Sequence, residues 1–222
     1  MVKDKFDEIL MNLIKKRRSV RVFNGKKIQK NDILSIIEAG IWAPTGCNNQ
    51  ELRFFILDTE EQIEGIIRFK PFLKGMSTFI LVFSDMSLDM SLKAYGRKSG
   101  KHLPYIDTGL ALMNMVLYAK SKNIDSCICN FSEYHIGIKS NRKKNIFNKI
   151  INGVKFKLNP YSLHEYSFIF YLRNHLKIPN HLKIMCGVAL GYAEKYPDIE
   201  TFKHGGKRIM RKDVKHYILD WY

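Results

Sequence analysis

The order in which helical and extended patterns follow one another constrains the fold of this chain most. Apolar residues repeat at three- and four-residue steps in residues 4–16 and again from Asn31 to Gly40, which predicts two amphipathic helices before any strand. Short apolar runs of strand character then alternate with further helical patterns. Helices first, followed by mixed strands and helices, favour an α+β fold over a regular βαβ winding.

Four runs have the length and residue types of strands: Arg53–Asp58, Ser77–Ser84, Ser126–Asn130 and Leu182–Tyr192. Thr59 to Gln62 has the form of a capping box, which predicts that a helix begins there. Ile106, Leu110, Met113 and Leu117 share one helical face, so residues 105–121 are predicted to form a long, mostly buried helix. A short helix is expected at 142–151, and residues 152–172 have no clear pattern.

The composition fits a single domain spanning residues 1–222. The 222 residues are 45% hydrophobic, which is enough for a core. No apolar stretch reaches the roughly 18 residues that a membrane-spanning helix needs. The charged start, Met1 to Asp7, is unlike a signal peptide, so a cytoplasmic location is expected and no membrane partner.

The net charge of +16 has two interpretations. A basic surface gives salt-sensitive affinity for nucleic acid, but it also attracts small anionic cofactors. The lysines are scattered, with local density only at 139–144, and no nucleic-acid-binding motif is evident. A nucleic-acid-associated protein is therefore retained only as a remote alternative.

The cysteines do not form a metal-binding pattern. Cys127 and Cys129 are two residues apart, which places both on one face of a strand and is shorter than zinc-ligand spacing. We therefore expect structural thiols and no metal site. Cys47 has no neighbouring base that would activate it, and it is expected to be a packing residue.

Two motifs carry the functional prediction. The first is Arg17-Arg18-Ser19 with Arg21, which offers guanidinium groups and a hydroxyl to an anion such as a phosphate. The second is the loop from Ala43 to Gln50, which is rich in side-chain amides and runs directly into the strand predicted from Arg53. The two motifs, at this spacing and with a predicted helix between them, are the strongest functional signal in the sequence.

These motifs make the chain resemble the nitroreductase family. Arg17-Arg18-Ser19 is similar to the family's opening motif, and Ala43-Pro44-Thr45 with Asn48 and Gln50 is similar to its Ala-Pro-Ser/Thr loop. Other matching positions are Asp107, Gly109, Ala111, Asn114, Gly191, Tyr192, Lys207, Arg208 and Val214. The resemblance runs from about residue 10 to the C-terminus, with a divergent stretch at 131–172.

The resemblance implies an α+β fold with a central, mostly antiparallel sheet flanked by helices and a C-terminal tail that wraps a partner subunit. It also implies a homodimer that binds FMN at the subunit interface. The residues it places against FMN are Arg17, Arg18, Ser19, Arg21, Pro44, Thr45, Gly46, Asn48, Gln50, Lys207 and Arg208. The basic residue of the C-terminal segment that contacts the phosphate is either one of these last two or Arg211 or Lys212. Arg21 either contacts the cofactor or forms a surface ion pair.

The implied activity is that of an FMN-dependent oxidoreductase. NADH or NADPH would pass hydride to flavin N5, and a small nitroaromatic or quinone acceptor would take electrons in a second, ping-pong step. The cofactor carries this chemistry, so no catalytic side chain is expected. The alternative is a specialised or non-reductase FMN-binding protein of the same fold.

Two departures from the family pattern bear on this reading. Asn123-Ile124-Asp125 stands where many members have Gly-Leu-Gly. Asn and Asp tolerate left-handed backbone better than other non-glycine residues, so the turn is expected to survive. The divergent stretch at 131–172 falls where the substrate pocket varies within the family. Its aromatic residues either pack in the core or line that pocket, and they are Tyr161, Tyr166, Phe168, Phe170 and Tyr171.

Overall fold

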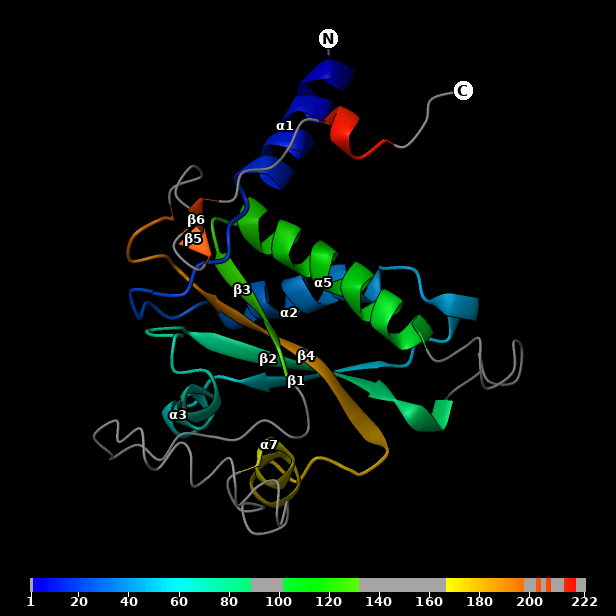
Figure 1. The fold of residues 1–222 in the computed structure, drawn as a ribbon, viewed down its shortest axis with the longest axis vertical. Coiled ribbons are helices and arrows are strands. Elements are labelled where there is room, and N and C mark those ends of the chain that lie inside the picture. The colour runs from blue at the N-terminus through cyan, green and yellow to red at the C-terminus, as the bar shows by residue number, and fades with distance from the viewer. Residues whose placement is uncertain are drawn as a thin grey trace.

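A computed structural model describes residues 2–88, 102–131, 167–197, 203–204, 207–208 and 214–218 (Figure 1). The helices are α1 (Val2–Lys16), α2 (Lys30–Ile41), α3 (Glu60–Phe69), α5 (Leu103–Ser121) and α7 (Phe168–Phe170), which continues as a π-helical turn, Tyr171–His175. The strands are β1 (Leu52–Leu57), β2 (Thr78–Asp85), β3 (Asp125–Asn130), β4 (Leu182–Gly191), β5 (Lys203–His204) and β6 (Lys207–Arg208). Three short 3-10 turns are Gly46–Asn48, Met86–Leu88 and Val214–His216.

The main sheet has four strands in the order β1-β2-β4-β3, and every neighbouring pair is antiparallel. Its strands overlap the four predicted runs, and the mixed order of elements confirms the α+β class. The predicted capping box is also confirmed, because the Thr59 side chain accepts from the Gln62 backbone N–H at the start of α3.

Helices cover both faces of the sheet. β2 alternates between the two sides: Phe79, Leu81 and Phe83 lie in one apolar cluster with residues of α3 and α7, whereas Ile80 and Val82 lie in a second with residues of α2 and α5. Figure 1 shows α5 and α2 side by side on one face and α3 and α7 on the other. The architecture is therefore three layers, helix, sheet and helix, with a fully buried central strand.

The α5 helix corrects one sequence prediction. Its core face consists of Asp107, Thr108, Ala111, Leu112, Met115, Val116 and Ala119. The face that the apolar repeat pointed to is largely open, because Ile106, Leu110 and Met113 are all exposed, as is Tyr105. The prediction of a mostly buried Ile106–Leu117 face is wrong for the single chain. On the opposite side, small residues such as Ala111 and Ala119 let the helix lie close to the sheet. Both faces of α5 therefore carry apolar side chains.

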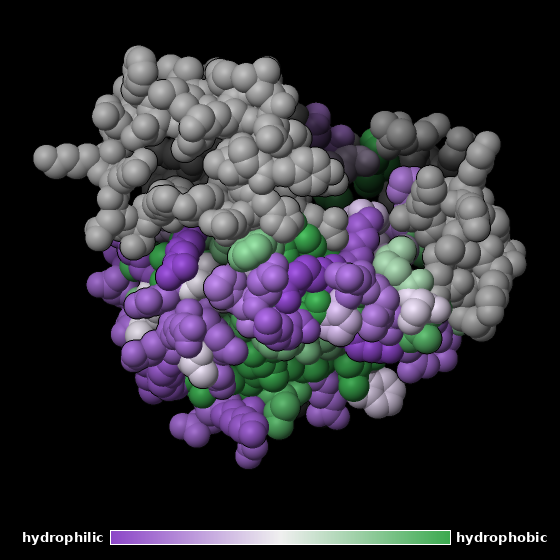
Figure 2. All heavy atoms as spheres, turned by 90° about the horizontal axis from the view of Figure 1, so that it is seen from below, coloured by the Kyte–Doolittle hydropathy of each residue, from purple (hydrophilic) through white to green (hydrophobic). Residues whose placement is uncertain are grey.

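Other apolar side chains are also uncovered in the described part of the chain. The apolar repeat of α1 forms a helix as predicted, yet Phe6, Ile9, Leu10 and Ile14 remain exposed. Figure 2 shows a contiguous apolar area among hydrophilic residues on the face seen from below. The described part of the chain therefore leaves apolar surface open, and such surface is typical of interaction sites.

The segment after α1 is fastened to the sheet at three distant places. Val20 N–H donates to Ser126 O of β3, Phe23 N–H donates to Lys74 O, and Asn24 N–H donates to Tyr192 O just after β4. The Phe23 ring lies against Gly191, where an added Cβ would come within 2.7 Å of it. This segment therefore has a fixed position over the ends of β3 and β4.

Several predicted features lie outside the described residues. These are the helix at 142–151, Tyr161 and Tyr166, and the basic residues Arg211 and Lys212. Phe168 is fully buried, and Phe170 and Tyr171 are half-buried, so the described aromatic residues of this stretch include core residues. No helix in the described ranges is long and apolar enough to cross a membrane.

Candidate functional site

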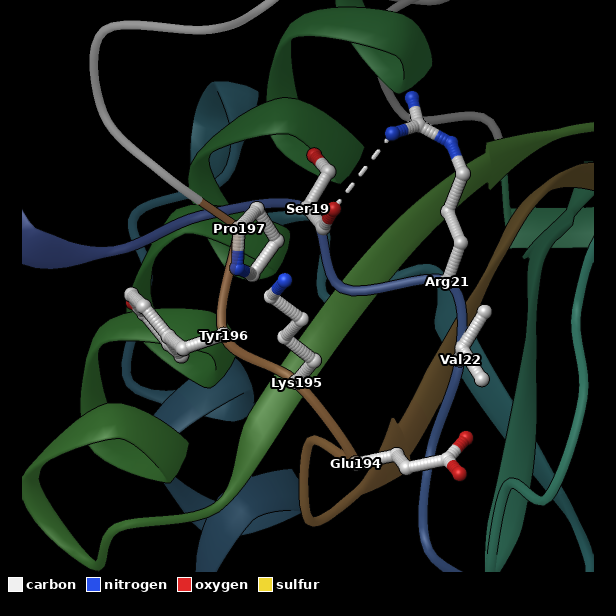
Figure 3. A pocket seen from close by; sticks show the side chains of 7 residues that line it. All are labelled: Ser19, Arg21, Val22, Glu194, Lys195, Tyr196 and Pro197. Carbon is white, nitrogen blue, oxygen red and sulfur yellow. Dashed lines mark hydrogen bonds between the residues drawn. The ribbon is translucent and has the colours of Figure 1, made fainter.

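A hollow of about 630 Å³ lies beside the segment that follows α1. Ser19, Arg21 and Val22 line it on one side, and Glu194, Lys195, Tyr196 and Pro197, which follow β4, line it on the other. Figure 3 shows the Lys195 side chain extending toward Ser19 and the Glu194 carboxylate pointing away. The hollow therefore presents two cationic side chains and a hydroxyl, a donor set that fits a phosphate.

The Arg21 side chain contacts the backbone of Ser19. Arg21 Nη1 lies 3.5 Å from Ser19 O, which is a weak hydrogen bond at the rim of the hollow (Figure 3). Val20, which lies between them, donates a hydrogen bond to Ser126 of β3, so the backbone of both residues is held in place. Arg21 is exposed, and most of its donor capacity is available to a ligand.

Arg18, by contrast, uses its side chain on the protein itself. Its Nη1 donates to Lys15 O at 2.6 Å and to Arg17 O at 2.7 Å, and so it satisfies carbonyl groups at the end of α1. Neither Arg17 nor Arg18 is among the residues that line the hollow. The structure brings Ser19 and Arg21 of the predicted motif together and gives Arg18 a helix-capping role.

Tyr196 and Lys120 support the opposite wall of the hollow. The Tyr196 hydroxyl donates to Lys16 O at the end of α1, and Lys120 Nζ lies 4.2 Å from the centre of the Tyr196 ring. Lys195 and Tyr196 were not predicted from the sequence. The signal that would have found them is their position just after the Gly191-Tyr192 pair that ends β4.

The second predicted motif forms a tight loop, residues 45–50, before β1. Asn48 N–H donates to Thr45 O, and Gln50 N–H donates to Thr45 Oγ1. Gly46 packs on Leu103 of α5, where an added Cβ would lie 3.1 Å from a Leu103 methyl carbon. The Asn48 and Gln50 side chains are exposed, and amides are suited to the polar edge of a flavin ring.

Cys47, at the centre of this loop, is exposed. The prediction that it is a packing residue is therefore wrong. Its φ of +55° places its backbone in the left-handed region.

The two motifs lie at opposite ends of α5. Gly46 N–H donates to Asp107 Oδ2 near the start of the helix, whereas Val20 is bonded to Ser126, which follows the helix after a short turn. The helix of 19 residues is about 28 Å long at 1.5 Å per residue. Figure 1 shows this separation. One chain therefore does not bring both motifs to the same small molecule.

Lys207 and Arg208 form β6, which pairs with β5. Only their backbone is described, so their predicted contact with phosphate stays a prediction. The remaining predicted residue, Pro44, is exposed at the start of the loop.

The three cysteines other than Cys47 are buried, as expected of structural thiols. The Cys129 thiol, through a hydrogen bond, and the more distant Arg21 and Arg17 charges lower the pKa of Cys127 to about 7, although burial opposes this. The same pairing, together with burial, raises the pKa of Cys129. Within the described residues no cluster of three or more His, Cys, Asp or Glu side chains is arranged to hold a metal ion.

The fold is α+β, and the hollow beside its first helix presents donors that suit an anion. Residues 14–70 and 68–192 match the model of the nitroreductase family. The chain belongs to the nitroreductase family.

A curated relative matches a smaller part of the chain. Over 82 aligned residues, 33% of the positions are identical to those of YdgI from Bacillus subtilis (strain 168), a protein that is named as a NAD(P)H nitroreductase. The match covers 35% of this chain and 39% of YdgI, so the chain spans well under half of the length of that relative.

Solved structures share the fold along almost the whole chain. A nitroreductase family protein from Streptococcus pneumoniae TIGR4 superposes with a TM-score of 0.63 at 16% identity, covering 95% of this chain and 99% of that one. A structure from Desulfovibrio desulfuricans, described as a nitroreductase in complex with FMN, superposes with a TM-score of 0.59 at 20% identity and covers 96% of both chains. At these identities the likeness establishes the fold.

Proposed function

We propose that this protein is an FMN-dependent oxidoreductase that takes electrons from NADH or NADPH and delivers them to a small organic acceptor. The observation that carries the proposal is the hollow beside α1, where Ser19, Arg21 and Lys195 present a hydroxyl and two cations. Family membership and the FMN complex of the Desulfovibrio relative support it.

The residues of this hollow fit the phosphate end of FMN. A phosphate carries close to two negative charges and offers several acceptor oxygens, which Arg21 and Lys195 can neutralise and Ser19 can hydrogen-bond. Lys207 and Arg208 are the candidates for further charge from the C-terminal segment.

The exposed amides of Asn48 and Gln50, with Thr45, fit the ring end. When bound, FMN supplies hydride transfer between the reduced nicotinamide and the acceptor. Thr45, Asn48 and Gln50 would orient the ring and offer donors to its polar edge. The protein surface around the ring would exclude water.

The separation of the two motifs supports a homodimer. Since the hollow and the loop lie at opposite ends of α5, a complete FMN site needs the hollow of one chain and the loop of a second. The exposed apolar faces of α1 and α5 supply the surface that such a dimer would bury.

The test is an anaerobic titration of the purified protein. We expect yellow protein with flavin absorption in the visible, bleached by NADH or NADPH and recoloured by a nitroaromatic or quinone acceptor. Protein that stays colourless after incubation with FMN would reject the proposal. Flavin that is bound but not reduced by either nicotinamide would instead favour a non-reductase FMN protein of this fold.

A further inference from the structure

A buried acidic corner lies directly behind the 45–50 loop. Asp107, on α5, accepts from the Gly46 backbone N–H at 3.0 Å and is only 3% exposed. This bond ties the loop to the helix at the point where Gly46 also packs on Leu103. The Asp107 carboxylate therefore helps to hold the 45–50 loop against α5.

The loop that Asp107 holds has an unfavourable backbone. Cys47, Asn48 and Gln50 all have φ near +50°, a left-handed conformation that disfavours side chains other than glycine. Each such residue adds backbone strain, although Asn adds less. This conformation persists only while surrounding contacts hold it, so the loop depends on its anchor.

Glu51 follows the loop and is the most deeply buried acidic side chain in the described part of the chain. It is 1% exposed, and the Asp107 and Asn49 side chains lie beside its carboxyl group. Burial raises the pKa of Glu51, and the Asp107 carboxyl beside it acts in the same direction, whereas backbone hydrogen bonding and Asn49 act against them. Two ionised carboxylates in one water-excluded corner would repel each other strongly.

The other charged groups around this corner are already engaged. Arg53 Nη2 lies 3.4 Å from Asp85 Oδ2, and its Nη1 donates to Gln50 O. Asp85 also presents its backbone N–H to Glu51 O. Arg53 is therefore turned toward Asp85 and the loop backbone, and the charge that faces Glu51 from α5 is Asp107.

We propose that Glu51 is a positioning residue whose neutral form allows Asp107 to hold the 45–50 loop, so that ionisation of Glu51 releases the loop. Under the proposed function this loop receives the FMN ring, and flavin affinity would then fall as the pH rises. The inference on the loop itself does not require FMN.

The direction with pH follows from linkage. A carboxyl group whose pKa is raised in the closed loop stabilises that state fully below its ordinary value of 4.5, and this contribution is lost as the pH rises through the raised value. Between those two values the opening equilibrium shifts by up to about tenfold for each pH unit.

The test measures hydrogen exchange of the loop in the full chain without added FMN. Protection factors of the peptide containing Gly46 would be compared at about pH 5.5, about pH 7 and about pH 9, a range above the ordinary pKa of a glutamate. We expect protection to fall with pH in the wild type and to stay level in Glu51→Gln, which keeps the shape without the charge. Asp107→Asn keeps an acceptor for Gly46 but removes the neighbouring charge, so the fall should end at lower pH and be smaller.

The matched control is Glu64→Gln, an exposed glutamate on α3 that should behave as the wild type. Equal pH dependence in wild type and Glu51→Gln, or protection that does not change with pH in the wild type, would overturn the inference. FMN affinity, read from flavin fluorescence at the same pH values, separates the two proposals. Loop protection that changes as expected in protein that binds no FMN supports the role of Glu51 and rejects the FMN proposal.

Discussion

Lys120 Nζ lies 2.9 Å from Asp125 Oδ1, and the other oxygen of the same carboxylate accepts from the Ala193 backbone N–H at 3.0 Å. One aspartate thus joins the end of α5, the start of β3 and the segment that forms one wall of the hollow. Both side chains of the pair are largely buried. The resemblance places glycine at this position in many family members, whereas Asp125 opens β3 and forms a buried ion pair here.

Replacing Lys120 by Met should lower the free energy of unfolding by roughly 2–3 kcal/mol, because Asp125 would keep a buried charge without its cation. Lys122→Met is the matched control. Lys122 pairs with Asp32 at 3.6 Å and is much more exposed, so its loss should change stability by less than about 0.5 kcal/mol. Urea denaturation at neutral pH measures both, and equal effects would mean that the buried pair contributes no more than a surface pair.

The pH dependence of this pair follows from the pKa of Lys120. Burial alone would lower it, but hydrogen bonds and charges from Asp125 and Tyr196 raise it above the ordinary 10.5. A raised lysine pKa stabilises the fold fully below 10.5 and loses that contribution as the pH rises through the raised value. The stability difference between wild type and Lys120→Met should therefore stay constant from neutral pH to about pH 10.

Asn123 should tolerate glycine but not a β-branched residue. Its φ is +58°, as expected for a turn that keeps its left-handed residue without the family's glycine. Asn123→Val should lower the free energy of unfolding by about 1–2 kcal/mol, whereas Asn123→Gly should leave it unchanged or slightly higher. Lys122→Val, at the neighbouring φ of −90°, is the control and should have a smaller effect. Thermal unfolding compares the three, and a harmless Asn123→Val would contradict the assignment of strain.

Arg21 should matter more to FMN binding than Arg18. Arg21 lines the hollow, while Arg18 caps α1. Arg21→Ala should weaken FMN binding by about tenfold or more, since a charge-assisted hydrogen bond contributes about 1.5–3 kcal/mol, and Arg21→Lys should restore part of it. Arg18→Ala should mainly lower the melting temperature. Fluorescence titration with FMN and thermal unfolding separate the two, and the reverse ranking would mean that Arg18 leaves its helix-capping position to hold phosphate.

A charge on the open face of α5 should separate the proposed dimer. Leu110→Arg places a guanidinium among Ile106 and Met113, which disfavours burial against a second chain. We expect a shift from dimer to monomer in light scattering after size-exclusion chromatography, with loss of FMN binding because the loop and the hollow would no longer meet. Phe72→Arg, at an exposed site after α3, is the control. A monomeric wild type that binds FMN would contradict the two-chain site.

The sequence predicted the helices and strands around the sheet well, because alternation and three- to four-residue repeats distinguish strands from helices. It could not say which apolar face of α5 is covered, since Ile106 and Leu112 are equally apolar and only the packing of α2 and the sheet distinguishes them. Within the candidate site, Ser19 and Thr45 could be proposed from local motifs, and their roles stay predictions. Lys195 was missed because its role depends on where β4 ends relative to α1. The separation of the two motifs was equally invisible, since it is set by the length and direction of α5.

The fastening of Val20 to Ser126 has a consequence for how the protein folds. These residues are far apart in the sequence, so their contact closes a long loop. The chain loses the conformational entropy of that loop before the hydrogen bond contributes to stability. β3 and β4 offer a docking surface only once they are paired. We therefore expect the wall that Ser19 and Arg21 contribute to form late in folding, after β3 and β4 have paired.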